Sequence, residues 1–151
     1  MGVFTDYVQT RWADNDIYGH VNNVAYYAFF DSTINRYLIA HGLDIHSKTD
    51  AIAYIVASQC TYLKAVSYPE ELRITLQVEK LGNSSVTYAL KLFNAAGELC
   101  AEARMTHVYV DQATQAPTPI PAHLRAAYEK ILMEGHEKQR GAISKGRLTF
   151  S

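Results

Sequence analysis

A long apolar run, VAYYAFF, occupies residues 24–30 without a charged or amide side chain. Asn22 and Asn23 stand before it, where a helix needs side-chain acceptors for its unpaired amide groups. We therefore predict a helix over residues 23–41, ended by Gly42 and about 28 Å long at a rise of about 1.5 Å per residue. Because its first two turns have no polar face, we expect other elements to cover them on most sides.

Alternation of apolar and polar residues indicates strands. Residues 72–79 alternate strictly, which is the period of a strand with one solvated face. Residues 86–93 alternate again after a turn at residues 81–84, so the two strands form a hairpin. Three further segments have the length and the aromatic and β-branched content of strands: residues 3–12, 51–66 and 98–111.

The segment 51–66 is long for one strand, so we expect a bend or bulge near residues 58–60. After residue 114 the sequence QAPTPIP ends the sheet, and Pro121 suits the first turn of a second helix. The apolar stripe of that helix is Leu124, Ala127, Tyr128, Ile131 and Leu132. The fold class is α+β, with five strands and one buried helix followed by a C-terminal helix.

The composition is that of one globular domain with a single core, since 48% of the 151 residues are hydrophobic and 19% are charged. We expect the domain to span residues 1–135 and a basic tail, residues 136–151, to be mobile or docked only on a partner. A formal charge of -1 gives no general attraction to nucleic acid or anionic membranes. No apolar run could span a bilayer and no leader pattern opens the chain, so we expect a soluble, cytoplasmic protein.

Several classes of site are excluded by missing motifs. Cys60 and Cys100 form no CxxC pair and are expected to be reduced core residues. The six histidines include no HExxH or HxH motif and no cluster with cysteine, so neither a metal nor another cofactor is indicated. The absence of GxSxG, GxxxxGK and GxGxxG excludes the usual serine hydrolases, nucleotide hydrolases and dinucleotide-binding proteins.

The remaining candidate is the turn before the helix. Asp14 and Asp16 lie there with Gly19, and their charge is directed at the N-terminus of the helix. Acids and asparagines before a helix are also common as plain turn and capping residues, and the residues alone leave this interpretation open.

A known family carries a similar set of residues: Asp16, Gly19, His20, Val21, Asn22, Asn23 and Tyr26, followed by Phe30 and Asp31. Over residues 3–132 the sequence resembles the hotdog-fold thioesterases of the 4-hydroxybenzoyl-CoA thioesterase type. The resemblance implies a five-stranded antiparallel sheet wrapped around one long helix. It also implies a homodimer or homotetramer with active sites at the interface, and hydrolysis of an acyl-CoA, in which coenzyme A is part of the substrate.

In that family the carboxylate that matches Asp16 is catalytic, and the backbone N–H that matches Asn23 polarises the thioester carbonyl. Asp16 would act as a general base or attack the carbonyl carbon directly, and both routes are open. The amide at the helix N-terminus would stabilise the oxyanion. We expect Asp14 to be a turn residue and Asp31 to be a buried group that holds the neighbouring strand.

The HVNN sequence is closer to the long-chain acyl-CoA and acyl-ACP branches, which favours an acyl chain over an aromatic group. Candidate substrate-binding residues are His20, which would orient the water or Asp16, Asn22, and Ser58, which would face the acyl pocket. Tyr26, Tyr27, Phe29 and Phe30 would line or back the acyl tunnel. The CoA phosphates need cations and amides at one rim, for which the candidates are Lys64, Arg73, Lys80, Gly82, Asn83 and Ser84. Two alternatives remain, an acyl-ACP thioesterase and a non-catalytic acyl-CoA-binding module.

Overall fold

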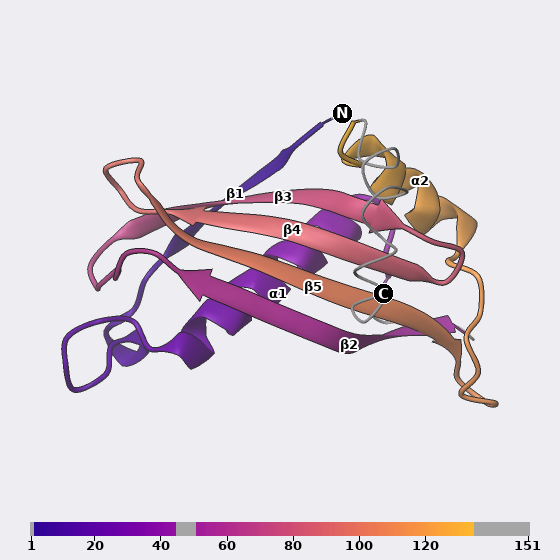
Figure 1. The fold of residues 1–151 in the computed structure, drawn as a ribbon, viewed down its shortest axis with the longest axis horizontal. Coiled ribbons are helices and arrows are strands. Elements are labelled where there is room, and N and C mark those ends of the chain that lie inside the picture. Colours follow the sequence, from indigo (N-terminus) through magenta and orange to yellow (C-terminus); the bar gives the residue numbers. More distant parts are fainter. Residues whose placement is uncertain (1, 45–50, 135–151) are drawn as a thin grey trace, which may run out of the picture.

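The computed structural model describes residues 2–44 and 51–134, which form one sheet with a long helix against it (Figure 1). The predicted basic tail lies outside the described residues. In chain order the elements are β1 (Phe4–Gln9), a short 3-10 helix (Trp12–Asp14), α1 (Asn23–Ala40), β2 (Ala51–Tyr62), β3 (Glu71–Leu81), β4 (Ser85–Phe93), β5 (Leu99–Asp111) and α2 (Ala122–Lys130).

The five strands pair in the order β1-β3-β4-β5-β2, and every neighbouring pair is antiparallel. β1 and β2 are therefore the two edges, and α1 crosses one face of the sheet (Figure 1). The predicted fold class is confirmed. Two strands end earlier than predicted, because the chain leaves the sheet after Gln9 for the 3-10 helix and after Tyr62 for the connection to β3. The bulge in β2 lies between Ile55 and Ala57 instead of residues 58–60.

The core lies between α1 and the inner face of the sheet. On β3 the alternation of the sequence is reproduced as burial, with Ile74 and Leu76 inside and their neighbours half-buried. α1 buries a stripe of residues spaced by three or four, which is the pattern of a helix packed on one face. The stripe comprises Ala25, Tyr26, Phe29, Phe30, Thr33, Ile34, Tyr37 and Leu38.

The expectation that the first turns of α1 are covered on most sides is wrong for the single chain. Val24 is 74% exposed and Ala28 is exposed as well. The physical reason is that one sheet covers one face of a helix only. An apolar side of α1 is thus left open.

Asp6, not Asp31, ties a strand to α1. The Asp6 carboxylate accepts hydrogen bonds from the Thr33 hydroxyl and from Nε of Arg36, both at 2.8 Å. Asp31 is exposed and accepts from the side-chain amide of Asn35, so its predicted buried role is wrong. Asp31 lies on the side of α1 that faces β2, away from β1.

α2 begins directly after Pro121, as predicted, and buries Leu124, Ala127 and Tyr128. Ile131 follows the helix and is also buried, while its carbonyl accepts the amide of Val78 on β3. Both cysteines are free thiols; Cys100 is buried and Cys60 half-buried. Within residues 2–44 and 51–134 no helix is long and apolar enough to cross a membrane.

Replacing Asp6 by alanine should lower the free energy of unfolding by about 1–3 kcal/mol, because Thr33 and Arg36 lose a charged acceptor. Urea denaturation of the two proteins measures the difference. Asp31→Ala is the matched control and should change stability by less than about 0.5 kcal/mol, since Asp31 is exposed. Equal losses for both variants would contradict the assignment.

Candidate active site

The segment before α1 folds into a closed turn. The Asp16 amide donates to the His20 carbonyl at 2.8 Å, and the Gly19 amide donates to the Asp16 carbonyl at 3.1 Å. Gly19 has φ of +80°, a left-handed conformation that favours glycine. The turn fixes the backbone of Asp16, while the side chain of His20 is exposed.

Asp14 anchors this turn, as predicted. Its carboxyl group is 2% exposed and accepts the Arg11 amide at 2.7 Å and the Arg11 guanidinium at 2.8 Å. Its carbonyl accepts the amide of Asn22 at 3.0 Å. Burial alone would raise the pKa of Asp14, but the hydrogen bonds from Arg11 outweigh it and lower that pKa.

Asp16 is exposed and its carboxylate is only half engaged. Oδ1 accepts the amide of Tyr18 at 2.8 Å, whereas Oδ2 has no hydrogen-bond partner among the described residues. The side chain lines a cleft of about 520 Å³ together with Trp12, Ala13, Asn15, Ile17 and Gly19. One oxygen is therefore available to water or to a ligand.

The N-terminus of α1 opens into a second cleft. Asn22 caps the helix, because its Oδ1 accepts the Ala25 amide at 3.1 Å. The Asn23 amide donates to no other group in the described part of the chain, as expected for the first turn of a helix. The cleft, of about 330 Å³, is lined by Val21, Asn23, Tyr26, Tyr62, Leu63, Lys64 and Ala65.

Two tyrosines form the wall of this second cleft. The rings of Tyr26 and Tyr62 meet edge to face with centroids 5.0 Å apart. The pKa of Tyr62 is raised to about 12. Burial is the largest cause, and the side-chain hydrogen bond with Cys60 is the next. Tyr62 is therefore a neutral hydroxyl near pH 7 and cannot act there as a base.

The structure gathers only part of the predicted site. Asn23, Tyr26 and Lys64 share one cleft, whereas Asp16 lines the neighbouring one. The side chain of Asn22 holds the helix cap, and Ser58 is exposed on β2. The role of each in substrate binding stays a prediction.

The candidate phosphate ligands do not form one rim within the chain. Lys64 pairs with Glu98 at 2.8 Å, and the Arg73 guanidinium lies 4.0 Å from the centroid of the Phe93 ring. The Lys80 to Ser84 hairpin lies at the other end of the sheet, beside α2 (Figure 1). There Arg125 donates to the carbonyls of Gly82 and Asn83. Sequence reasoning missed Arg125, because it lies on α2 and comes close to the hairpin only in the folded chain.

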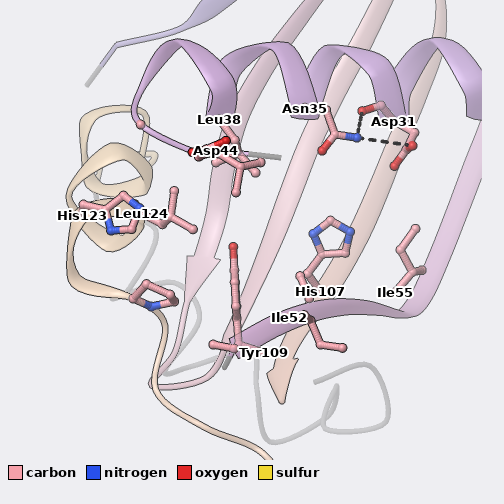
Figure 2. Close-up of a pocket in the computed structure, with 15 residues that line it drawn as sticks. Asp31, Asn35, Leu38, Asp44, Ile52, Ile55, His107, Tyr109, His123 and Leu124 are labelled. Atoms are coloured by element: carbon pink, nitrogen blue, oxygen red, sulfur yellow. Dashed lines mark hydrogen bonds between the residues drawn. The ribbon is translucent and has the colours of Figure 1, made fainter. Parts of the chain in front are cut away.

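A cavity larger than these two clefts lies elsewhere, between the second half of α1, the start of β2, the end of β5 and α2 (Figure 2). It measures about 820 Å³ and has polar groups on otherwise apolar walls. Sequence reasoning missed it and gave no role to His107, which lines it. The sequence does carry a signal for it, which is a histidine at an inward-facing position of a strand and a tyrosine at the following inward-facing position, two residues later.

Comparison with known proteins identifies the family. The sequence matches the thioesterase-like superfamily over residues 10–128. The chain belongs to this superfamily. The crystal structure of the PA5185 protein of Pseudomonas aeruginosa is similar to this chain, with 44% sequence identity and a TM-score of 0.82, and the match covers 87% of this chain and 92% of that one. The predicted hotdog fold and family are thereby confirmed.

Two further proteins are similar to this chain in sequence, with lower identity. The uncharacterized protein YsmA of Bacillus subtilis is 33% identical over 110 residues, which are 72% of this chain and 74% of that protein. The 1,4-dihydroxy-2-naphthoyl-CoA hydrolase of Thermosynechococcus vestitus is 28% identical over 133 residues, 83% of this chain and 91% of that protein.

In this thioesterase-like protein, the contribution of Asp14 to the free energy of unfolding should depend on pH. Because its pKa is lowered in the folded state, Asp14 stabilises the fold above its unfolded pKa of about 3.9, and this stability is lost as the pH falls through the lower folded pKa. Asp14→Asn should therefore cost about 1–3 kcal/mol at pH 7 and progressively less toward pH 3. Urea unfolding of both proteins across this range measures the difference, and a cost independent of pH would contradict the ion pair.

Proposed function

We propose that the protein is a thioesterase that hydrolyses an acyl-CoA to the free carboxylic acid and CoA. The observation that carries the proposal is a carboxylate with one free oxygen, Asp16, in the turn that leads to a helix end with a free amide, Asn23. Membership of the thioesterase-like superfamily supports it, and so does a relative named for hydrolysis of an acyl-CoA.

The two groups suit the two demands of thioester hydrolysis. As the carbonyl carbon is attacked, negative charge develops on its oxygen, and the Asn23 amide at the positive end of the α1 dipole stabilises it. In one route Asp16 takes a proton from the attacking water, the C–S bond breaks and the CoA thiolate receives that proton. In the other, Asp16 attacks the carbon itself, the C–S bond breaks and the CoA thiolate leaves. Water then hydrolyses the resulting mixed anhydride, which releases the carboxylic acid, restores the Asp16 carboxylate and supplies the proton that the thiolate takes up.

A second copy of the chain would complete this site. β2 is an edge strand on which Ile55 is 50% and Val56 58% exposed, and an unpaired apolar edge is a template for self-pairing. If two copies of the chain pair through β2 about a twofold axis at the middle of this strand, the start of β2 in one copy lies beside the end of β2 in the other. The large cavity of one copy, at the start of β2, then lies next to the partner's cleft at the end of β2, where Asn23 lies. The functional unit we propose is this homodimer.

Asp16→Asn tests the catalytic role. The variant should lower kcat by about 100-fold or more with little change in KM, because the amide can neither take a proton nor attack. Steady-state hydrolysis of a panel of alkanoyl-CoA and aroyl-CoA esters measures the effect, with acyl-ACP as a competing donor. The matched control is Asp111→Asn. It makes the same exchange at a carboxylate that caps a turn distant from Asp16 in the chain. Full activity of Asp16→Asn would refute the assignment, and tight binding without turnover by the wild type would indicate a binding module.

Val56→Asp tests the shared site. A charge on each strand of the proposed pair should shift the mass measured by light scattering from about twice 16.9 kDa to 16.9 kDa, and hydrolysis should be lost with it. Tyr7→Asp is the control, because Tyr7 is equally exposed on β1, the opposite edge. A monomeric wild type that hydrolyses acyl-CoA would contradict the proposed dimer.

A further inference from the structure

A buried tyrosine lines the cleft at the N-terminus of α1. Tyr26 lies one turn after Asn23 on the same helix, and both residues line this cleft. The side chain of Tyr26 is 4% exposed, so the protein encloses almost all of it. A buried tyrosine usually has a hydrogen-bond partner for its hydroxyl. The partners of this hydroxyl therefore show whether it is available to a ligand.

Two contacts place the Tyr26 hydroxyl beside the start of α1. The backbone of Val66 hydrogen-bonds to this hydroxyl, and the contact acts to lower the pKa of Tyr26, so the Val66 amide is the donor. The carbonyl of Val66 accepts the amide of Val21 at 2.9 Å. Val21 directly precedes the N-cap residue, Asn22. The hydroxyl thus lies at the end of the helix where the free Asn23 amide is found.

Helix geometry supports the same placement. Side chains of an α-helix point back toward its N-terminus, and residues three apart lie on the same face. The ring of Tyr26 therefore covers the turn that begins at Asn23. Val21 and Ala65, which flank the contact with Val66, both line the cleft. The hydroxyl group and the Asn23 amide consequently border one space.

The hydrogen of the Tyr26 hydroxyl is unused in the described part of the chain. A hydroxyl carries one hydrogen and can accept through two lone pairs. Here the oxygen accepts from the Val66 amide, and no described residue accepts the hydrogen. An enclosed hydroxyl that is oriented by an incoming hydrogen bond thus has its own donor available to a ligand.

Burial keeps this hydrogen on the oxygen. It is the largest influence on the pKa of Tyr26 and raises it above the ordinary value of 10.0. Tyr26 is therefore neutral near pH 7 and a hydrogen-bond donor. The ring is also held in place, because it meets the ring of Tyr62 edge to face with centroids 5.0 Å apart. A donor that is fixed before the reaction needs no rearrangement when negative charge develops.

We infer that the Tyr26 hydroxyl is a second donor to the thioester carbonyl oxygen and forms the oxyanion site together with the Asn23 amide. The inference rests on the proposed function. Both donors belong to one turn of α1, so the helix backbone sets their spacing. No proton is transferred from Tyr26, which stays protonated while Asp16 takes the proton or attacks. Tyr26 is then a catalytic residue, instead of only a wall of the acyl tunnel.

Tyr26→Phe tests this role, because it removes the hydroxyl and keeps the ring. The variant should lower kcat by about 100-fold and change KM by less than about threefold, since an oxyanion donor acts mainly in the transition state. Steady-state hydrolysis of the ester that the wild type turns over fastest measures both constants. An unchanged kcat would overturn the inference. A raised KM with an unchanged kcat would also overturn it and leave Tyr26 as a wall of the tunnel.

Tyr37→Phe is the matched control. Tyr37 is a tyrosine of the same helix, is 3% exposed, and donates its hydroxyl hydrogen to the Ala127 carbonyl, away from the cleft. This variant should keep the kcat of the wild type although it loses a buried hydrogen bond. Urea unfolding of both variants shows that each is folded in the assay. An equal drop of kcat in Tyr37→Phe would mean a general effect on α1 and would overturn the inference.

A spectroscopic measurement tests the hydrogen bond without turnover. The probes are ketone analogues of octanoyl-CoA and benzoyl-CoA, in which a methylene separates the sulfur from a ¹³C-labelled carbonyl. Donors to the oxygen draw electron density from the carbonyl carbon, so its resonance on the wild type should lie downfield of that on Tyr26→Phe. Tyr37→Phe should match the wild type. Equal carbonyl shifts on the wild type and Tyr26→Phe, or no binding of either ketone to the wild type, would overturn the inference.

The two measurements separate the inference from the proposed function. If no ester is hydrolysed but the carbonyl shift depends on the Tyr26 hydroxyl, the proposed function is wrong and Tyr26 remains a donor to a bound carbonyl. If the wild type and Tyr26→Phe hydrolyse esters equally well, the proposed function stands and the inference is overturned.

Discussion

The contact of α1 with a single face of the sheet is the constraint on which the other features depend. Phe30 and Ile34 belong to the same buried apolar cluster as the inner residues of β3 and β4, and this burial of apolar surface fixes the position of the helix axis. The N-cap at Asn22 fixes where the helix starts. As a consequence, the first amide of α1 has a defined place at the surface and no partner among the described residues, which is the property that an oxyanion site requires.

One-sided packing also leaves surfaces unfinished in a single chain. Val24 on α1 and Val56 on β2 are apolar and exposed, and both belong to the side of the molecule on which β2 forms the edge. The interior near this side is not simply apolar, since His107 and three tyrosines form a continuous hydrogen-bonded chain within it. A buried polar chain of this kind is stable only when its members have hydrogen-bond partners, and in the described part of the chain Nε2 of His107 is the ring nitrogen that has none.

Local patterns predicted the elements well. The strict alternation of residues 72–79, the asparagines before α1 and Pro121 before α2 each encode their own structure, because neighbours in sequence decide it. The start of α1 and the end of β5 were predicted to the residue. The anchoring role of Asp14 was also predictable, since a turn before a helix needs an acceptor of this type.

Contacts between distant segments were not predictable in the same way. Asp6 and Asp31 are both single acids among apolar neighbours, and the sequence does not say which of them faces the helix and which faces the cavity. Arg125 reaches the hairpin at Gly82 and His107 meets Tyr88 only because the sheet and α2 bring them together. For the same reason the sequence could name Asp16 and Asn23 but could not show that they line separate clefts of one chain.

The central claim is that the thioester carbonyl binds at the free amide of Asn23. The most direct measurement titrates the protein with an acyl-CoA ketone analogue, in which a methylene separates sulfur from the carbonyl, and follows the backbone amide resonances. If the claim holds, the Asn23 N–H moves downfield and becomes protected from exchange, ahead of amides elsewhere on α1. Saturable binding that leaves the Asn23 resonance unchanged would contradict it.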